Sequence, residues 1–242
     1  MKTKILMAIL VSLLVILVVS PGIPAGNKAA ERGQGTGGKD AKGPPEIEMG
    51  MFVNRPYSSP PWYPSDEETR NYRWYKRVHW VSDDLPLDCV VYTSGAPTGA
   101  VGAVTAAFAE WESYTETDIY ADVSENGTDS PPAPALQDEN TLSWQGIDGA
   151  GGIIAVTYFW YWRDSKELVA FDIVFDIDED WLTGFDIQNV ATHELGHTLV
   201  LDDLISPKTS ALTMHAYTWP GDTWKQTLGW GDILGIQKIY GE

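Results

Sequence analysis

Cysteine is almost absent from this sequence. Cys89 is the single cysteine among 242 residues, so no disulfide bond can form within the chain. It lies in the strand-like run LPLDCVVYT, where we expect a small buried apolar side chain. Any stabilisation beyond the hydrophobic core must therefore come from packing or from metal ions.

Positive charge is scarce as well. The chain has 16 Lys and Arg against 34 Asp and Glu, which gives a formal net charge of −18. This charge argues against nucleic acid and anionic membrane surfaces as partners, and it fits a soluble, extracellular monomer. The carboxylates offer ligands for calcium, although a solvated acidic surface needs no ligand.

The longest apolar run is somewhat short for a membrane span. ILMAILVSLLVILVV, near the N-terminus, falls below the roughly 20 residues that a transmembrane helix needs. Because MKTK precedes it and small residues follow near Ala25, it predicts a secretory signal peptide over residues 1–25. The alternative is an uncleaved segment that tethers an extracellular domain to the membrane.

Two segments separate this signal from a folded domain. Residues 26–60 are rich in Gly, Pro and charge without periodicity, which predicts a disordered linker. Residues 61–80 carry many aromatic side chains and are expected to pack on the domain. We therefore divide the chain into residues 1–25, a disordered linker with an N-terminal arm over 26–71, and one domain over 72–242.

The domain contains both predicted strands and predicted helices. β-Branched, aromatic and alternating residues predict strands over 89–94, 117–123, 140–147, 151–162 and 167–177. Apolar residues at helical spacing predict helices over 99–115, 187–200 and 232–241, the second with Asp186 as its N-cap. This order indicates an α+β fold, in which helices cover a sheet and a small C-terminal part follows.

The stretch NVATHELGHTLVLDDL, residues 189–204, contains the pattern H-E-x-x-H. His193 and His197 lie one helical turn apart on one face, so both imidazoles can bind one zinc ion at about 2.0–2.1 Å. Glu194 lies a quarter-turn away, where it can act as general base on a water held by the metal. The alternative is a pair of ordinary histidines, each with a hydrogen-bond partner.

The third metal ligand is less obvious. The only glutamate after His197 is Glu242, which argues against a glutamate ligand on a later helix. The remaining candidates are Asp202, Asp203, Asp222, Asp232 and His215. On a continuous helix Asp203 points about 80° away from the His193 face, so it can bind the metal only if the helix ends near residue 200 and the chain turns back.

VATHELGHTLVLDD resembles the metzincin motif H-E-x-x-H-x-x-G-x-x-H/D, specifically in the matrixin branch that includes the matrix metalloproteinases. Further segments resemble parts of matrixin catalytic domains in the same order: WYKRVHWVSDDLPLDCVVYTS, VTAAFAEWES, LSWQGIDGAGGIIAVTYFWY, FDIVFDIDEDW and LTMHAYTWPGDTWKQTLGWGDILGIQKIYG. The resemblance covers about residues 72–242. It implies a metzincin-like zinc protease domain, with a twisted, mixed five-stranded sheet, two long helices, and a small C-terminal subdomain with a Met-turn and a terminal helix.

The resemblance implies a role for each residue of the zinc motif. His193, His197 and Asp203 would bind the catalytic zinc ion. Glu194 would be the general base, and Met214 would be the Met-turn residue beneath the site.

Other positions acquire implied roles in the same way. Ala216 and Tyr217 would help to wall the pocket for the residue after the scissile bond, and Asp232 would anchor the closing helix. A structural calcium ion would bind near Asp148, Gly149, Gly151 and Gly152.

The sequence departs from the family pattern at several positions. Val200 stands where the family has a glycine that lets the chain turn, and a β-branched residue at φ > 0 costs about 1–2 kcal/mol. If Asp203 is poorly placed as a result, either Asp202 takes its place as third ligand or zinc binds weakly. Residues 26–71 lack the cysteine of the cysteine switch, so no latency of that kind is expected. His79 and His215 do not match the second, structural zinc site and are interpreted as non-ligands.

The sequence thus predicts a secreted zinc endopeptidase with Glu194 as general base. An extended protein substrate would add to the strand GIIAVTYF as an extra strand. The alternative is a catalytically inactive metzincin-like domain that binds peptides or a partner in the same cleft. The two hypotheses differ in whether Asp203 completes a three-ligand site beside an open fourth position. A zinc amidase acting on small molecules fits a long open cleft less well.

Overall fold

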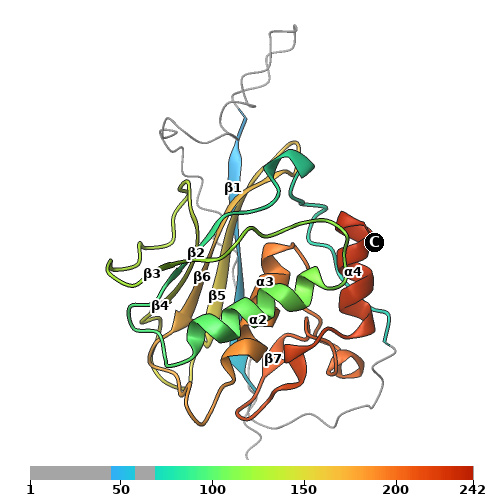
Figure 1. The fold of residues 1–242 in the computed structure, drawn as a ribbon. Helices are drawn as coiled ribbons and strands as arrows, with labels where there is room; N and C mark the ends of the chain where they lie inside the picture. Colours follow the sequence, from blue (N-terminus) through green and yellow to red (C-terminus); the bar gives the residue numbers. More distant parts are fainter. Residues whose placement is uncertain (1–44, 58–68, 242) are drawn as a thin grey trace, which may run out of the picture.

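The computed structural model describes residues 45–57 and 69–241, and the predicted signal peptide over 1–25 lies outside them. The elements follow one another along the chain (Figure 1) as β1 (Ile47–Pro56), η1 (Ser82–Asp84), β2 (Cys89–Tyr92), α2 (Ala100–Glu112), β3 (Ser124–Asn126), β4 (Asn140–Gln145), β5 (Ala155–Trp162), β6 (Leu168–Asp176), α3 (Ile187–Thr198), η2 (Pro207–Thr209), β7 (Tyr217–Thr218), η3 (Trp224–Gln226) and α4 (Trp230–Tyr240). Among these described residues, no helix has the length and apolar character that crossing a membrane requires.

The strands form one mixed sheet in the order β3-β2-β4-β6-β5-β1-β7. β2 pairs in parallel with β3 and β4, and β4 pairs in parallel with β6, whereas β5 is antiparallel to β6. β1 is antiparallel to β5, and the short β7 is parallel to β1. The predicted α+β fold with a mixed sheet is therefore confirmed. The sheet has seven strands rather than five, because β1 and β7 extend it beyond β5.

Helices α2 and α3 pack against each other over one face of the sheet (Figure 1). Trp111 of α2 is fully buried, and its indole N–H donates to Thr192 O of α3 at 2.8 Å. Asp186 caps α3 as predicted, since its carboxylate accepts a hydrogen bond from Asn189 N–H at 2.7 Å. Every residue of α3 except Gln188 is buried, so the surrounding core fixes the position of each of its side chains.

Cys89 and the aromatic arm lie where the sequence placed them. Cys89 is buried in the core, and burial raises the pKa of its thiol. In the described part of the arm, Trp80 is buried and its indole N–H donates to Thr198 O at 2.9 Å. The arm is therefore tied to the end of α3.

Strand β1 corrects the prediction of a disordered linker over this part of the chain. Residues 47–54 pair one by one with residues of β5. The strand turns Gly50, Phe52 and Asn54 toward the interior, and Met49 and Met51 on its other side are exposed. A glycine and an amide on the inner face give no alternation of apolar and polar residues, so the strand has no signature in the sequence.

The second predicted strand was also wrong in position. β3 covers Ser124–Asn126 rather than residues 117–123. The N–H groups of Ile119 and Tyr120 donate to the Glu112 carboxylate at 2.9 and 2.8 Å. This segment therefore wraps around the end of α2 before the chain enters the sheet.

Replacing each of two helical glycines by alanine distinguishes the effect of core packing on stability from the effect of helix propensity. At Gly196 in α3 a Cβ atom would overlap Met214 Sδ and lie 2.7 Å from Trp111 Cζ2, whereas at Gly102 in α2 nothing lies within 4 Å. We expect Gly196→Ala to lower the free energy of unfolding by about 1–3 kcal/mol through overpacking. Gly102→Ala should raise it by about 0.5–1 kcal/mol, because alanine is the better helix former. Urea unfolding of the two variants checks this, and effects of the same sign would contradict it.

Candidate metal centre

The chain reverses direction directly after α3. Val200 has a φ of 61°, in the left-handed region, and Leu201 N–H donates to Gly196 O at 3.0 Å. This six-to-one hydrogen bond with a left-handed residue is the geometry of a Schellman turn. The turn that Asp203 requires near residue 200 is therefore present, and it is made without glycine.

The turn brings Asp203 beside the two histidines of α3. Asp203 Oδ1 lies 3.5 Å from His193 Nε2 and 3.6 Å from His197 Nε2, and the two Nε2 atoms are 3.2 Å apart. Two nitrogen ligands of a tetrahedral zinc ion, each about 2.0–2.1 Å from it, are separated by about 3.3–3.4 Å. Within the described ranges, His193, His197 and Asp203 form the group of potential ligands that can hold a metal ion.

Hydrogen bonds on the far side of each imidazole orient the two histidines. His193 Nδ1 lies 2.7 Å from Thr213 O, and His197 Nδ1 lies 2.8 Å from Leu201 O. A proton on each Nδ1 leaves Nε2 free as a metal ligand, the usual arrangement at zinc sites. Burial lowers the pKa of both histidines, which favours the neutral form that binds metal.

The two aspartates after the turn have different partners. Burial alone would raise the pKa of Asp203, but His197 and His193 outweigh it and the pKa falls to about 2. Its Oδ1 atom is buried and finds no hydrogen-bond partner among the described residues. Asp202 instead pairs with Arg73 at 2.9 Å, away from the histidines. An ionised, unsatisfied oxygen facing two imidazoles fits a cation, so the geometry favours Asp203 over Asp202 as third ligand.

Glu194 is held beside the same cluster. It is fully buried, and burial raises the pKa of its carboxyl group, which suits a proton acceptor. The Thr157 hydroxyl of β5 donates to Glu194 Oε2 at 2.6 Å. Glu194 Oε1 has no hydrogen-bond partner in the described part of the chain. One oxygen is thus fixed by the sheet, and the other is left without a hydrogen bond to the described residues.

Met214 and Asp232 both contact the elements that carry the cluster. Met214 is buried against Gly196, one residue before His197. The Asp232 carboxylate accepts hydrogen bonds from Thr213 N–H at 2.8 Å and from Met214 N–H at 3.1 Å. α4 is thereby fastened to the turn that carries Thr213 O, the partner of His193.

The predicted pocket wall contains a feature that the sequence analysis missed. Tyr217 belongs to β7, and Ala216 N–H donates to Leu204 O at 3.0 Å. Behind this wall the ammonium of Lys225 is buried, where it donates to His215 O and, at 3.2 Å, to Thr218 Oγ1. Burial lowers the pKa of Lys225 to about 8. The lysine sits in the polar run GDTWKQT, which gives no sign of burial.

The segment for which the resemblance implies calcium binding is a hydrogen-bonded loop. Gly149 and Gly151 both have positive φ, and Asp148 Oδ1 accepts from Ile153 N–H at 2.8 Å. Two carboxylates from the end of β6 join this turn. Glu179 Oε1 accepts the N–H groups of Gly151 and Gly152 at 2.7 and 3.0 Å, and Asp176 Oδ2 accepts Asp148 N–H at 3.1 Å. The sequence analysis missed Asp176 and Glu179, although both stand in the acidic run DIDED.

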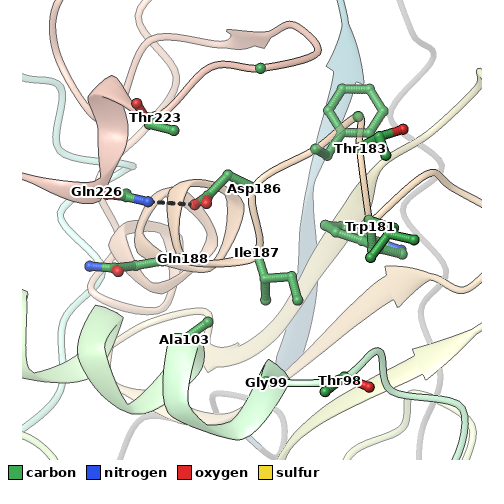
Figure 2. Close-up of a pocket in the computed structure, with 14 residues that line it drawn as sticks. Thr98, Gly99, Ala103, Trp181, Thr183, Asp186, Ile187, Gln188, Thr223 and Gln226 are labelled. Atoms are coloured by element: carbon green, nitrogen blue, oxygen red, sulfur yellow. Dashed lines mark hydrogen bonds between the residues drawn. The ribbon is translucent and has the colours of Figure 1, made fainter.

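An open hollow of about 400 Å³ lies away from the histidines, at the amino end of α3. Figure 2 shows its polar wall, where Gln226 donates to Asp186 at 2.9 Å. Gly99, which precedes α2, Ala103 of α2 and the chain around Trp181 complete it. None of the predicted site residues lines this hollow.

Strand β1 crosses the metal centre itself, which sequence reasoning did not foresee. The Phe52 ring stacks on the His197 imidazole, with ring centroids 4.0 Å apart and planes 7° apart. Asn54 faces Glu194 and offsets part of the rise in its pKa that burial causes, although no contact of the Asn54 amide with the described residues has the geometry of a normal hydrogen bond. The sequence analysis also missed Thr157, whose one signal is that it is the single aliphatic hydroxyl side chain in the run IIAVTYFWYW.

Comparison with known proteins gives consistent matches. A family model described as Matrixin matches residues 79–241. Stromelysin-1 of Mus musculus is 30% identical over 166 residues, and interstitial collagenase of Bos taurus is 34% identical over 166 residues; each alignment covers 67% of this chain and 33% of the relative. The chain thus spans about a third of the length of these two relatives. Among solved structures, high choriolytic enzyme 1, a hatching enzyme zinc-protease from Oryzias latipes, matches with a TM-score of 0.34 and 13% identity, over 71% of this chain and 98% of that one.

The matrixin model covers more than half of the chain and includes the whole metal centre. This chain therefore belongs to the matrixin family of zinc metalloendopeptidases. The family assignment made from the sequence is confirmed, and zinc is the metal that the family places at such a centre.

Zinc binding separates the two adjacent aspartates. If Asp203 is the third ligand, Asp203→Ala should weaken zinc binding at least 100-fold, because it would remove one of three ligands. Asp202→Ala should leave zinc affinity within about threefold, since its carboxylate pairs with Arg73. Competition with a chelator of known zinc affinity measures both. The reverse order of effects would assign the third ligand to Asp202.

Lys225 should leave a mark on the pH dependence of stability. Its folded-state pKa of about 8 lies below the 10.5 of an exposed lysine, so between these values the unfolded chain binds more protons. The free energy of unfolding should then rise with pH over this window, by up to about 1.4 kcal/mol per pH unit. Urea unfolding of metal-free wild type and Lys225→Met at pH 7.5, 8.5 and 9.5 tests this. If the free energy of unfolding depends on pH in the same way in both chains, the pKa of Lys225 is not lowered in the folded state.

Proposed function

We propose that this chain is an extracellular zinc endopeptidase that hydrolyses peptide bonds in proteins, with Glu194 as general base. The observation that carries the proposal is the convergence of three oriented ligands beside a buried carboxylate. His193, His197 and Asp203 have ligand spacings that suit one zinc ion. Glu194 is on the same helix, with one oxygen fixed by Thr157 and the other unpaired among the described residues.

These residues support a hydrolytic reaction. A zinc ion held by the three ligands supplies Lewis-acid polarisation of a peptide carbonyl and lowers the pKa of water. Glu194 Oε1 takes the proton of the attacking water, and burial of its carboxyl raises its affinity for that proton. Glu194 then delivers the proton to the leaving amide nitrogen, while Thr157 keeps the carboxylate in place.

Calcium binding and secretion are further parts of the proposal. The turn at Asp148 with the carboxylates of Asp176 and Glu179 gathers oxygen ligands of the kind that calcium prefers. An N-terminal run with the features of a signal peptide supports export, or tethering if the run is not removed. A monomer acting on protein substrates is consistent with both.

A non-catalytic, peptide-binding domain is the second candidate function. Phe52 stacked on His197 favours it, because the ring occupies space directly beside one of the candidate metal ligands. The complete set of ligands and the oriented Glu194 favour the enzyme, since a peptide-binding domain needs neither.

Replacement of the general base tests the enzyme directly. We expect Glu194→Gln in the full zinc-loaded chain to slow hydrolysis of denatured casein by about 10²–10⁴-fold. Zinc content should stay at that of wild type, because Glu194 is not a ligand. A variant that keeps the wild-type rate, or that loses its zinc, would remove Glu194 from the role of base.

A further inference from the structure

The place where an external peptide would bind is filled by this chain's own residues. β1 pairs antiparallel with β5 from Ile47 opposite Trp162 to Asn54 opposite Ala155. It then pairs in parallel with β7, and Tyr57 N–H donates to Thr218 O at 2.8 Å. Without β1, β5 would be an edge strand and β7 would not touch the sheet. The groove between them therefore accepts one extended strand of a fixed direction.

The strand in this groove covers the metal centre. Phe52 stacks on His197 and also on Phe159 of β5, at a centroid distance of 5.3 Å. Asn54 is 1% exposed and faces Glu194, so the peptide groups on either side of Val53 cross the cluster. His193, Glu194 and His197 are exposed by 1% or less. Any peptide that reaches Glu194 along β5 must replace this segment.

The segment is held by an ion pair and a hydrogen bond far from the metal centre, but its polar groups beside the metal centre make few hydrogen bonds. Glu48 forms an ion pair with Arg163 Nε at 2.6 Å and accepts a hydrogen bond from the Tyr161 hydroxyl, near the end of β5. At the other end the buried Asn54 amide faces Glu194, but neither it nor Glu194 Oε1 makes a hydrogen bond of normal geometry with the described residues. Unsatisfied buried polar groups cost free energy, which weakens docking over the cluster. A permanent strand of the sheet would place such groups where they are paired.

We propose that residues 47–56 are an intramolecular ligand of the peptide-binding groove, which an external peptide displaces. The preferred peptide is extended, runs antiparallel to β5, and carries an aromatic side chain over His197 and a short amide two residues later. The apparent affinity for such a peptide is reduced by the fraction of chains in which the segment is docked. This inference rests on the proposed function for its biological meaning, but binding itself needs no catalysis.

A binding measurement tests the displacement. The probe is a fluorescein-labelled peptide IEMGMFVNRPY, the sequence of residues 47–57, titrated with zinc-loaded full chain carrying Glu194→Gln so that nothing is hydrolysed. We expect the affinity to rise at least 10-fold when Phe52→Ala is added to this chain, because the competing segment loses its contact with His197. Met51→Ala, on the exposed side of the same strand, is the matched control and should change nothing.

A second variant guards against misfolding of the first. Glu48→Gln removes the ion pair with Arg163 and leaves the residues over the cluster intact, so it should also raise the affinity for the peptide. A peptide with Ala in place of its Phe should bind more weakly to every chain. Equal affinities in the parent, Phe52→Ala and Glu48→Gln chains would overturn the proposal. A dimer that forms by exchange of the segment, seen as concentration-dependent gel filtration, would also overturn the intramolecular assignment.

Casein hydrolysis by the same variants with Glu194 restored separates the two proposals. Faster hydrolysis by Phe52→Ala and Glu48→Gln supports both. Stronger peptide binding without hydrolysis by any chain supports the docked segment and overturns the enzyme. Unchanged hydrolysis and unchanged binding in the variants leave the enzyme standing and overturn the docked segment.

Discussion

The left-handed turn at Val200 is the constraint on which the metal centre depends. A β-branched residue at φ 61° costs about 1–2 kcal/mol, and the chain tolerates it because the Val200 side chain is completely buried. Full burial of such a side chain contributes about 1.5–3 kcal/mol, so packing outweighs the strain. Tyr75 N–H also donates to Val200 O at 2.9 Å. The result is that Asp203 reaches both histidines at nearly equal distances, as a turn built on glycine would allow.

Because the groups around Asp203 are buried, their charges interact strongly with one another. The buried His193, Glu194 and His197 and the largely buried Asp203 share one region with the ammonium of Lys225. In such a medium an unpaired carboxylate is costly, and a cation beside it is correspondingly favoured. Lys225 supplies positive charge from behind the pocket wall, but its hydrogen bonds hold it at His215 O and Thr218. A cation between His193, His197 and Asp203 would satisfy Asp203 Oδ1.

The site residues that the sequence predicted lie close together along the chain, whereas the residues that it missed are distant from them in sequence. His193, Glu194 and His197 share one helical turn, so spacing alone places them on one helix. Asp203 followed from the resemblance, because spacing pointed it away until the helix was known to end. Thr157 and Lys225 meet α3 from positions more than 25 residues away, with no periodic signal of their own. β1 was missed for the same reason: its inner face presents Gly50, Phe52 and Asn54, and only β5 makes these residues a strand.

An open fourth position at the metal was the criterion that separated an enzyme from a binding domain, and the structure shows why this criterion does not decide alone. Phe52 covers the cluster, which by itself indicates a site that no longer admits water. Yet the covering residue belongs to a strand that follows the edge of β5, where a peptide substrate would also lie. A site that had lost its activity would not need the hydrogen bond from Thr157 to Glu194 or the backbone carbonyls beside both imidazoles. Residues 47–56 thus lie where a substrate peptide would lie, beside polar groups that are still held in position. An external peptide strand has to compete with this segment for pairing with β5.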